Sequence, residues 1–208
     1  MPKPFRIALT GGLASGKSTI ANLFSENDVP IIDTDTISRK IVAQGKPALE
    51  KIIAEFGKQV ISDKGELDRQ KLKEIIFGAP QAKTKLEEIL HPLIFQEIEN
   101  QLSRISFPYC IVVIPLLIET GTMSQFDHIL LVDIPEEIQM KRAMKRDNSS
   151  KQLIQSIINS QTKRNERIKH ADDIIDNTVK IKELGKIVNS LHKKYLNLSQ
   201  QHNKTTIN

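Results

Sequence analysis

The sequence has one cysteine, no long apolar stretch and no recognisable targeting segment. Cys110 stands alone among 208 residues, so no disulfide can form within the chain and a reducing setting is favoured. No stretch approaches the roughly 20 apolar residues that a membrane helix needs. The N-terminal stretch MPKPFRIALT lacks the apolar core and the cleavage site of a signal peptide. We therefore expect a cytoplasmic protein that has no membrane partner.

Aromatic residues are also scarce, at 4% of the chain, and none lies within residues 127–170. This scarcity matters because residues 141–170 carry nine lysines and arginines against two acids, a local charge of +7 in a chain whose net charge is +5. Such a patch suits either a polyphosphate ligand or a DNA backbone. The lack of aromatic stacking platforms disfavours nucleic acid as the partner, although a steep salt dependence of DNA binding would restore that interpretation.

Strand and helix patterns alternate at both ends of the chain. Continuous apolar runs typical of buried parallel strands lie at 5–10, 29–33, 108–115, 128–135 and 172–176. Helices are expected near 18–26, 34–42, 136–147, in two stretches up to about 169, and near 180–195. This alternation predicts a parallel α/β sheet flanked by helices.

The middle of the chain and its last residues depart from this alternation. Residues 46–105 have no strong strand signal and predict a helical block. Its last helix, over 80–105, should be interrupted at His91–Pro92, because a proline disfavours helical geometry in the preceding residue. Residues 197–208 lack apolar periodicity, and we expect a disordered tail.

The stretch GGLASGKST at 11–19 carries the strongest functional signal. Gly11-x4-Gly16-Lys17-Ser18 fits the P-loop pattern, between a predicted strand and a predicted helix. The glycines let backbone N–H groups approach phosphate oxygens, and the helix N-terminus adds a positive concavity. Lys17 places a charge on the β- and γ-phosphates, and the Ser18 hydroxyl is a hard oxygen that suits Mg²⁺. The pattern predicts nucleotide binding by Gly12, Ala14, Ser15, Gly16, Lys17, Ser18 and Thr19.

Two acids close to the end of the second predicted strand are candidate catalytic residues. The carboxyl ends of parallel strands meet at one edge of a sheet, so we expect Asp33 and Asp35 to lie near the P-loop. A carboxylate there can accept the proton of an attacking hydroxyl or hold Mg²⁺ through water. Asp33, at the strand end itself, is the better candidate for the base. Asp35 either shares the Mg²⁺ role or caps the next helix.

Two signals of other P-loop classes are missing. The strand CIVVIP does not end in the aspartate that many P-loop enzymes use to hold Mg²⁺, so Asp33, Asp35 or Glu119 must substitute. The chain also lacks an Asn-Lys-x-Asp guanine signature, which disfavours a GTPase.

Pairs of arginines within the basic segment predict a lid over the phosphates. Arg142 and Arg146 are four residues apart and share a helix face, and Arg164 and Arg167 are three apart. Phosphoryl transfer needs positive charge over the γ-phosphate and shelter from water, and a mobile arginine-bearing lid supplies both. The alternative for any one arginine is a solvated helix face.

These residues together resemble the dephospho-CoA kinase family, which phosphorylates the ribose 3′-hydroxyl of dephospho-CoA with ATP. The resemblance runs through LTGGLASGKST (9–19), DTD (33–35) followed by Arg39, LHPLI (90–94), VVIPLLIE (112–119), KRAMKRD (141–147), and Gln161-x5-Arg167 leading to ADDIIDN (171–177). The family usually has glycine where this chain has Ala14 and alanine where it has Thr34. Neither difference removes a functional group.

The resemblance implies a P-loop NTPase-type α/β fold with a helical substrate-binding insertion and a helical lid. It implies a nucleotide-binding core of residues 1–45, 106–135 and 171–196, a CoA-side domain of residues 46–105, and a lid of residues 136–170. The implied reaction makes coenzyme A in the last step of its biosynthesis, with ATP as co-substrate and Mg²⁺ as cofactor. A nucleoside or nucleotide kinase on the same scaffold is the alternative, which the helical block and LHPLI disfavour. No obligatory protein partner is evident.

The resemblance also suggests roles for single residues. Asp33 matches the expected base, and Lys17 and Arg142 would join it in catalysis. Arg142 and Arg167 match lid positions that face the phosphates or adenine of ATP, and Asn177 could reach the adenine. The implied substrate-binding residues are Asp33, Asp35, Arg39, His91, Pro115, Leu116 and Glu119. The alternative for His91 is a histidine at a helix kink, and the alternative for Leu116 is a packing role without substrate contact.

Overall fold

The computed structural model describes residues 3–206. The chain divides into two compact units. The first combines the residues up to Ile32 with those from Ile105 onward, and the second comprises Asp33–Arg104. Among the described residues, no helix combines the length and the apolar character that crossing a membrane requires.

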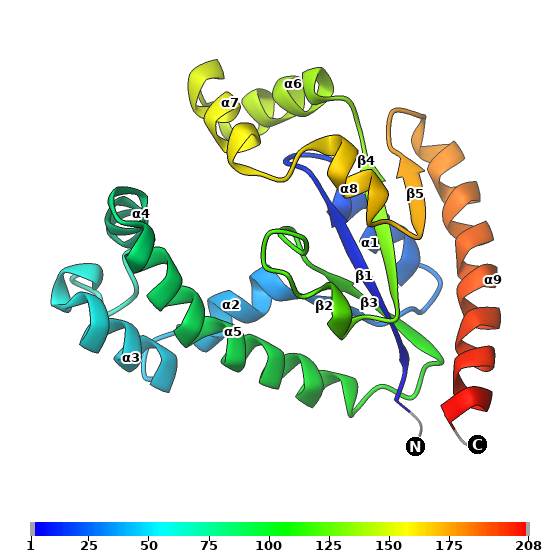
Figure 1. The fold of residues 1–208 in the computed structure, drawn as a ribbon, viewed down its shortest axis with the longest axis horizontal. Coiled ribbons are helices and arrows are strands. Elements are labelled where there is room, and N and C mark those ends of the chain that lie inside the picture. Colours follow the sequence, from blue (N-terminus) through cyan, green and yellow to red (C-terminus); the bar gives the residue numbers. More distant parts are fainter. Residues whose placement is uncertain (1–2, 207–208) are drawn as a thin grey trace. The chain divides into compact units, whose positions relative to one another are not determined.

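A five-stranded sheet forms the centre of the first unit, in the order β2-β3-β1-β4-β5 (Figure 1). Its strands are β1 (Phe5–Gly11), β2 (Ile31–Asp33, whose last residue opens the second unit), β3 (Tyr109–Val113), β4 (His128–Asp133) and β5 (Asp173–Asp176). The pairs β1–β3, β1–β4 and β4–β5 are parallel. Gly11 pairs with Val132, so β1 and β4 end at the same edge of the sheet. The predicted parallel sheet is confirmed.

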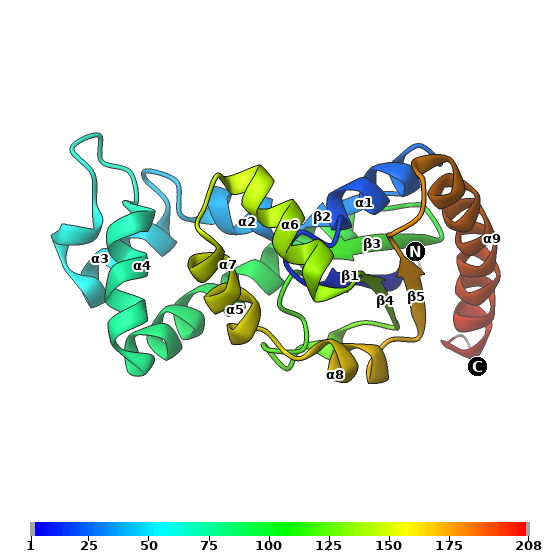
Figure 2. The same cartoon turned by 90° about the horizontal axis from the view of Figure 1, so that it is seen from above.

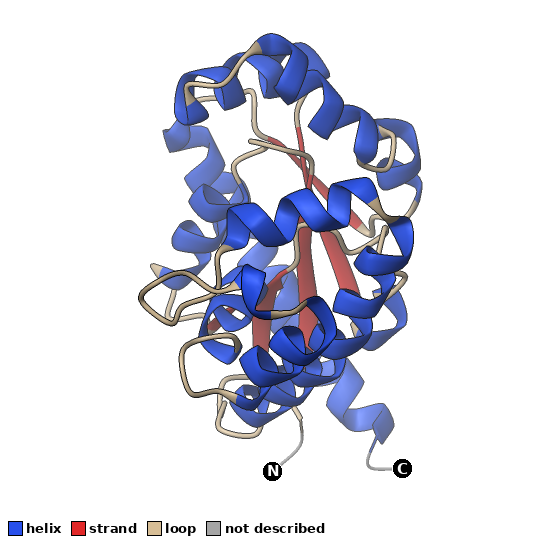
Figure 3. Cartoon of the chain, turned by 90° about the vertical axis from the view of Figure 1, so that its left-hand side faces the viewer, coloured by secondary structure: helices blue, strands red, loops and turns tan. Residues whose placement is uncertain are grey.

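Helices cover both faces of this sheet (Figures 2 and 3). Those that contact the strands are α1 (Lys17–Ser25), α8 (Arg164–Lys169) and α9 (Ile181–Thr206). Helices α6 (Glu136–Asp147) and α7 (Lys151–Ser160) lie beyond the ends of the strands (Figure 1), and a short 3-10 turn η2 (Met123–Gln125) precedes β4. Helices α1 and α8 lie on opposite faces (Figures 1 and 2). On the α1 side, Phe24 and Tyr195 are fully buried with their rings stacked at 6.0 Å, which ties α1 to α9.

The predicted disordered tail is wrong for the residues that the structure describes. Helix α9 continues to Thr206, and residues 207–208 lie outside the described part of the chain. Ser199 is fully buried, Leu198 packs against the sheet core, and the His202 ring meets Phe5 edge-on at 5.4 Å. These residues extend the buried face that Tyr195 begins, so packing stabilises a segment whose own sequence is polar.

The second unit is helical, as predicted. It contains α2 (Thr34–Ile41), α3 (Pro47–Phe56), the 3-10 turn η1 (Lys58–Val60), α4 (Arg69–Gly78) and α5 (Pro80–Leu102). Local signals set its boundaries: Pro47 opens α3, and Asp68 caps α4 by accepting hydrogen bonds from Gln70 N and Lys71 N at 3.1 and 3.0 Å. This unit also includes α2, which the sequence interpretation assigned to the core.

Helix α5 passes through Pro92 without the predicted interruption. Proline removes one backbone hydrogen bond, but Leu86, Ile89, Leu90 and Leu93 on both sides of it pack against the core around Ile52 and Leu72. That packing, with contacts to α2, α3 and α4, outweighs the local preference.

Candidate nucleotide-binding site

The loop between β1 and α1 has the strand–loop–helix context that its sequence predicts. Gly16 is the N-cap of α1 with φ of 96°, and Ala14 has φ of 52°, so both adopt left-handed backbone conformations. Gly16 makes no side-chain cap, and the N-terminus of a helix directs N–H groups and a positive dipole end towards an anion. The loop can therefore bind an anion.

Lys17 folds over this loop. Its Nζ donates hydrogen bonds to the carbonyl oxygens of Gly11 and Gly12, at 2.8 and 3.0 Å. Ser18 follows with an exposed side chain, and Thr19 is partly buried. The ammonium group and the hydroxyl thus lie at the start of the helix, where the sequence predicted phosphate and Mg²⁺ contacts.

Asn177 and Arg142 lie beside the loop. The Asn177 side-chain Nδ2 donates to the Ser15 carbonyl at 2.6 Å, and the backbone carbonyl of Asn177 accepts from Arg142 Nη2 at 2.9 Å. A Cβ on Gly16 would lie 2.0 Å from Asn177 Nδ2. Only glycine therefore fits at position 16 in this arrangement.

Arg167 and Gln139 pack against the other side of the loop. A Cβ on Gly12 would lie 2.6 Å from Gln139 Oε1 and 3.0 Å from Arg167 Nη2. Arg167 is 6% exposed, its Nη1 donates to the Thr162 carbonyl, and burial lowers the pKa of its guanidinium. Nearby, Leu13 N donates to Gln161 Oε1 at 3.0 Å.

Among the described residues, the buried side-chain atoms without a hydrogen-bond partner are Ser15 Oγ, Gln139 Oε1 and Arg167 Nε. These unpartnered atoms all belong to residues that form or contact the loop. Buried polar groups without partners are unusual in native proteins and often mark a site that a ligand or water completes. The three atoms come from the loop (Ser15), from α6 (Gln139) and from α8 (Arg167), and these residues lie against one another at the loop. This arrangement supports a polar ligand at the loop.

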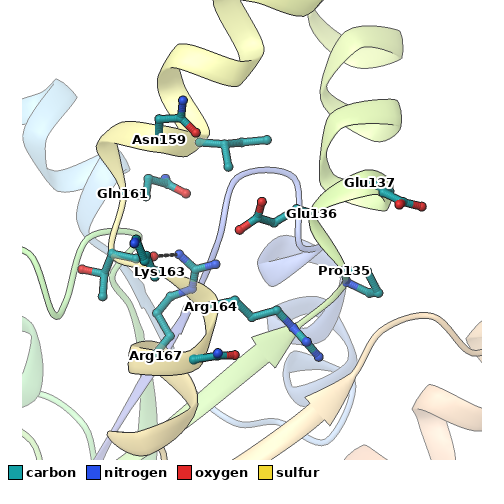
Figure 4. Close-up of a pocket in the computed structure, with 11 residues that line it drawn as sticks. Pro135, Glu136, Glu137, Asn159, Gln161, Lys163, Arg164 and Arg167 are labelled. Carbon is teal, nitrogen blue, oxygen red and sulfur yellow. Dashed lines mark hydrogen bonds between the residues drawn. The ribbon is translucent and has the colours of Figure 1, made fainter.

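A pocket of about 870 Å³ lies between the start of α6 and the α7–α8 segment (Figure 4). Glu136 points into it and Glu137 points away, while Lys163, Arg164 and Arg167 supply positive charge. Arg164 forms a bidentate ion pair with Asp133 at the end of β4: Nε lies 3.0 Å from Oδ1 and Nη2 lies 2.6 Å from Oδ2.

Residues after β3 support the same segment. The Glu119 carboxylate accepts a hydrogen bond from Thr162 N through Oε1 at 2.7 Å, which links the β3–η2 connection to the start of α8. Pro115 is partly buried, and Leu116 is 41% exposed, whereas Leu117 is fully buried and packs.

The remaining predicted residues belong to the second unit. Asp33 is exposed and is the N-cap of α2, since its Oδ1 accepts from Thr36 N at 3.0 Å. The capping alternative for Asp35 is therefore wrong: Asp35 lies in the first helical turn, because the helix begins directly after the strand. Arg39 is exposed on α2 and His91 is partly buried on α5. This unit has its own pocket of about 350 Å³, lined by residues that include Lys40, Lys46, Pro47 and Leu93.

Sequence reasoning missed Asp133 and Gln139. Asp133 ends a buried strand, which is the same signal that singled out Asp33. Gln139 lies three residues before Arg142 on α6 and so shares its helix face.

The donor set fits Mg²⁺ bound mainly by a substrate. Among the described residues, no group of three or more histidine, cysteine, aspartate or glutamate side chains could hold a metal ion. Mg²⁺ usually keeps several waters and binds through one or two protein groups plus substrate phosphates. The exposed Ser18 hydroxyl beside the loop offers one hard oxygen of the suitable kind.

The parallel sheet and the loop between β1 and α1 define a P-loop kinase fold. Shikimate kinase from Acinetobacter baumannii shares this fold, with a TM-score of 0.54 at 14% identity over 93% of this chain and 94% of the other. Two solved structures are more similar: a protein from Thermus thermophilus (TM-score 0.83, 27% identity, 93% of this chain and 98% of the other) and dephospho-CoA kinase from Campylobacter jejuni (TM-score 0.68, 28% identity, 95% and 98%).

Sequence comparison then gives the family. The dephospho-CoA kinase family model matches residues 5–183. The dephospho-CoA kinase of Mannheimia succiniciproducens is 45% identical over 96% of this chain and 95% of its own length, and that of Coxiella burnetii is 46% identical over 94% and 98%. The chain belongs to the dephospho-CoA kinase family.

Proposed function

We propose that this chain transfers the γ-phosphoryl group of ATP to the ribose 3′-hydroxyl of dephospho-CoA. The product is coenzyme A, and the reaction is the last step of coenzyme A biosynthesis. The family match over residues 5–183, which spans the P-loop, the helical unit and the arginine-bearing helices, carries this proposal.

The phosphates of ATP would bind in the P-loop. Backbone N–H groups at the start of α1 receive the β-phosphate, and Lys17 moves its ammonium group from the Gly11 and Gly12 carbonyls to the β- and γ-phosphates. Ser18 would hold Mg²⁺, which when bound neutralises charge between these phosphates.

Arginines of the proposed lid, residues 136–170, would stabilise the charge that develops during transfer. Arg142 and Arg167 lie on either side of the loop, where they contact Asn177 and the Gly12 region. Arg164 lines the pocket and is held there by Asp133, so it needs only a change of partner to reach an anionic ligand. Preorganised positive groups of this kind supply most of the catalysis in phosphoryl transfer.

Asp33 would act as the general base. It ends β2, in the same sheet as β1, and uses Oδ1 to cap α2. Its second oxygen, Oδ2, would accept the proton of the 3′-hydroxyl as that oxygen attacks phosphorus. The helical unit, with Asp35, Arg39 and His91 and its own pocket, would bind the rest of the acceptor.

The single cysteine supports a reducing compartment, and we propose the cytoplasm. Cys110 is a buried, free thiol, and burial raises its pKa to about 12. A thiol of this kind is chemically inert, so nothing in its surroundings requires an oxidising environment.

The direct test is ADP formation from ATP with a panel of acceptors: dephospho-CoA, adenosine, AMP and pantetheine phosphate. Turnover with dephospho-CoA alone is expected. Turnover with another acceptor in its place would preserve the P-loop argument and refute the proposed substrate. Turnover with none, together with salt-sensitive DNA binding, would favour the nucleic-acid alternative.

The role of Asp33 is tested with Asp33→Asn, because asparagine still caps a helix but cannot take a proton. The expected result is a kcat lowered about 10²- to 10⁴-fold with unchanged ATP affinity. Asp68→Asn is the matched control, since Asp68 caps α4 in the same way. If the two substitutions change kcat equally, Asp33 acts only as a helix cap and the proposed role as a base is refuted.

A further inference from the structure

We propose that Asn177 is a positioning residue for the phosphate loop: its side chain holds the Ser15–Gly16 peptide in the orientation that binds phosphate. This role differs from the adenine contact that the family resemblance suggested. The inference rests on the proposed use of the loop for the phosphates of ATP.

The sheet fixes the position of Asn177. The residue directly follows β5, and its backbone N–H donates to the carbonyl of Asp133 at 3.0 Å, one step beyond the pairing of Asp133 with Asp176. Asn177 is 6% exposed. It therefore offers a rigid anchor, while the loop residues that it contacts, Ser15 and Gly16, are small.

The side chain of Asn177 holds one carbonyl of that loop. Its Nδ2 donates to the Ser15 carbonyl at 2.6 Å, across 162 residues of sequence. None of the described peptide bonds is cis. In a trans peptide the C=O and the following N–H point in opposite directions. With the Ser15 carbonyl held towards Asn177, the Gly16 N–H must point away from Asn177, towards the inside of the loop.

Gly16 makes such an anchor necessary. Its φ of 96° is open to glycine and to few other residues, and glycine exchanges readily between backbone conformations. A Cβ at this position would lie 2.0 Å from Asn177 Nδ2, so the amide fills the space that any side chain would take. Glycine therefore permits the backbone conformation that the loop needs, and the hydrogen bond from Asn177 restricts the loop to that conformation.

Asn177 also places the first lid arginine. Arg142 Nη2 donates to the Asn177 backbone carbonyl at 2.9 Å, and Arg142 Nη1 lies 4.0 Å from the position of a Cβ on Gly16. One residue therefore orders both a backbone donor and a cationic side chain proposed to contact the same phosphates.

The test compares two ligands, ATP and inorganic tripolyphosphate, by titration calorimetry. Tripolyphosphate has the phosphates and no adenine. For Asn177→Ala and Asn177→Asp we expect Kd to rise by about tenfold, and by the same factor for both ligands, since a buried hydrogen bond is lost. The KM for dephospho-CoA should not change. Asn189→Ala is the matched control, because it removes an exposed amide that accepts from Asn27 Nδ2 at 3.1 Å.

A loss of ATP affinity with unchanged tripolyphosphate affinity would overturn the inference and assign Asn177 to the adenine, while the proposed function would stand. Unchanged affinity for both ligands would also overturn it. Wild-type protein that binds neither ligand would refute the proposed function and this inference together.

A second measurement uses the wild-type chain and does not depend on the variants folding. In ¹⁵N-labelled protein, ATP and tripolyphosphate should shift the Asn177 side-chain and Gly16 amide resonances equally if Asn177 acts through the loop. An Asn177 shift seen with ATP alone would contradict that role.

Discussion

Arg164 and Asp133 form a bidentate ion pair at the carboxyl edge of the sheet, with Nη2 2.6 Å from Oδ2 and Nε 3.0 Å from Oδ1. The Asp133 side chain is 10% exposed and that of Arg164 is 40% exposed. The pair fixes α8 against β4 and holds one cation in the lining of the pocket. The hydrogen bonds that Arg164 donates to the Asp133 carboxylate raise the pKa of Arg164 further above its ordinary value, so the guanidinium stays charged.

Asp133→Asn should lower the free energy of unfolding by about 1 kcal/mol, because the bidentate ion pair becomes a single hydrogen bond from the charged guanidinium to a neutral amide oxygen. Urea unfolding measures the change. Asp147→Asn is the control: its partner Arg146 is 59% exposed, and exposed pairs contribute within about 0.5 kcal/mol. Equal losses for the two variants would show that the bidentate pair at Asp133 stabilises the fold no more than an exposed ion pair does.

Gly12→Ala should destabilise the protein by about 1–3 kcal/mol through overpacking. Its Cβ would lie 2.6 Å from Gln139 Oε1, which is buried and held by Gln139 Nε2 donating to the Ile134 carbonyl. Gly185→Ala is the contrast, because the residue is inside α9 and, apart from its chain neighbours and the backbone of its own helix, no atom lies within 4 Å of the added Cβ. That variant should gain about 0.5–1 kcal/mol. Thermal unfolding of both variants checks the signs; a stable Gly12→Ala would refute the described packing.

Ala14→Gly should raise the free energy of unfolding by about 0.5 kcal/mol. Ala14 has φ of 52°, where a Cβ costs about 1–2 kcal/mol, and the greater freedom of glycine in the unfolded chain offsets part of the gain. Asn148 has φ of 47°, and asparagine tolerates this region. Asn148→Gly should therefore change stability less, in the same urea experiment. A destabilised Ala14→Gly would mean that the alanine methyl makes contacts that outweigh its strain.

Asp173 makes stability depend on pH in the acid range. Burial raises the pKa of Asp173, but hydrogen bonds from Lys194 and His128 outweigh it and leave the pKa below the ordinary value of 3.8. Lys194 Nζ lies 2.6 Å from Oδ1, and His128 Nε2 lies 2.7 Å from Oδ2. A lowered folded-state pKa adds stability above pH 3.8 and loses it as the pH falls through the folded-state value.

Asp173→Asn should accordingly be less stable than wild type at pH 6, with a difference that shrinks as the pH falls below 3.8. Urea unfolding at pH 6, 4 and 3 measures it. A difference that stays constant over this range would contradict the assignment.

Local signals made much of the fold and the loop predictable. The P-loop lies between a strand and a helix because glycines, an apolar run and helical spacing are adjacent in sequence, and Asp68 caps α4 for the same local reason. Residues 136–147 form α6 as predicted.

Long-range packing accounts for what was not predictable. The contact of Asn177 with Ser15 spans 162 residues and depends on the strand order, which no local pattern contains. The same holds for Ser199, which is polar and yet fully buried in the helical tail, and for Gln139, whose role appears only when α6 lies against the loop. The sequence did not predict that Asp33 caps α2, because that prediction needs the exact first residue of the helix, and local patterns do not fix helix ends to a single residue.

The most direct test of the account is the structure of the product formed from ATP and dephospho-CoA, by mass spectrometry and ³¹P NMR. We predict one added phosphate, as a monoester on the ribose 3′-oxygen, and no reaction when the 3′-hydroxyl is replaced by hydrogen. A phosphate at another position, or transfer to the 3′-deoxy compound, would contradict the proposed reaction.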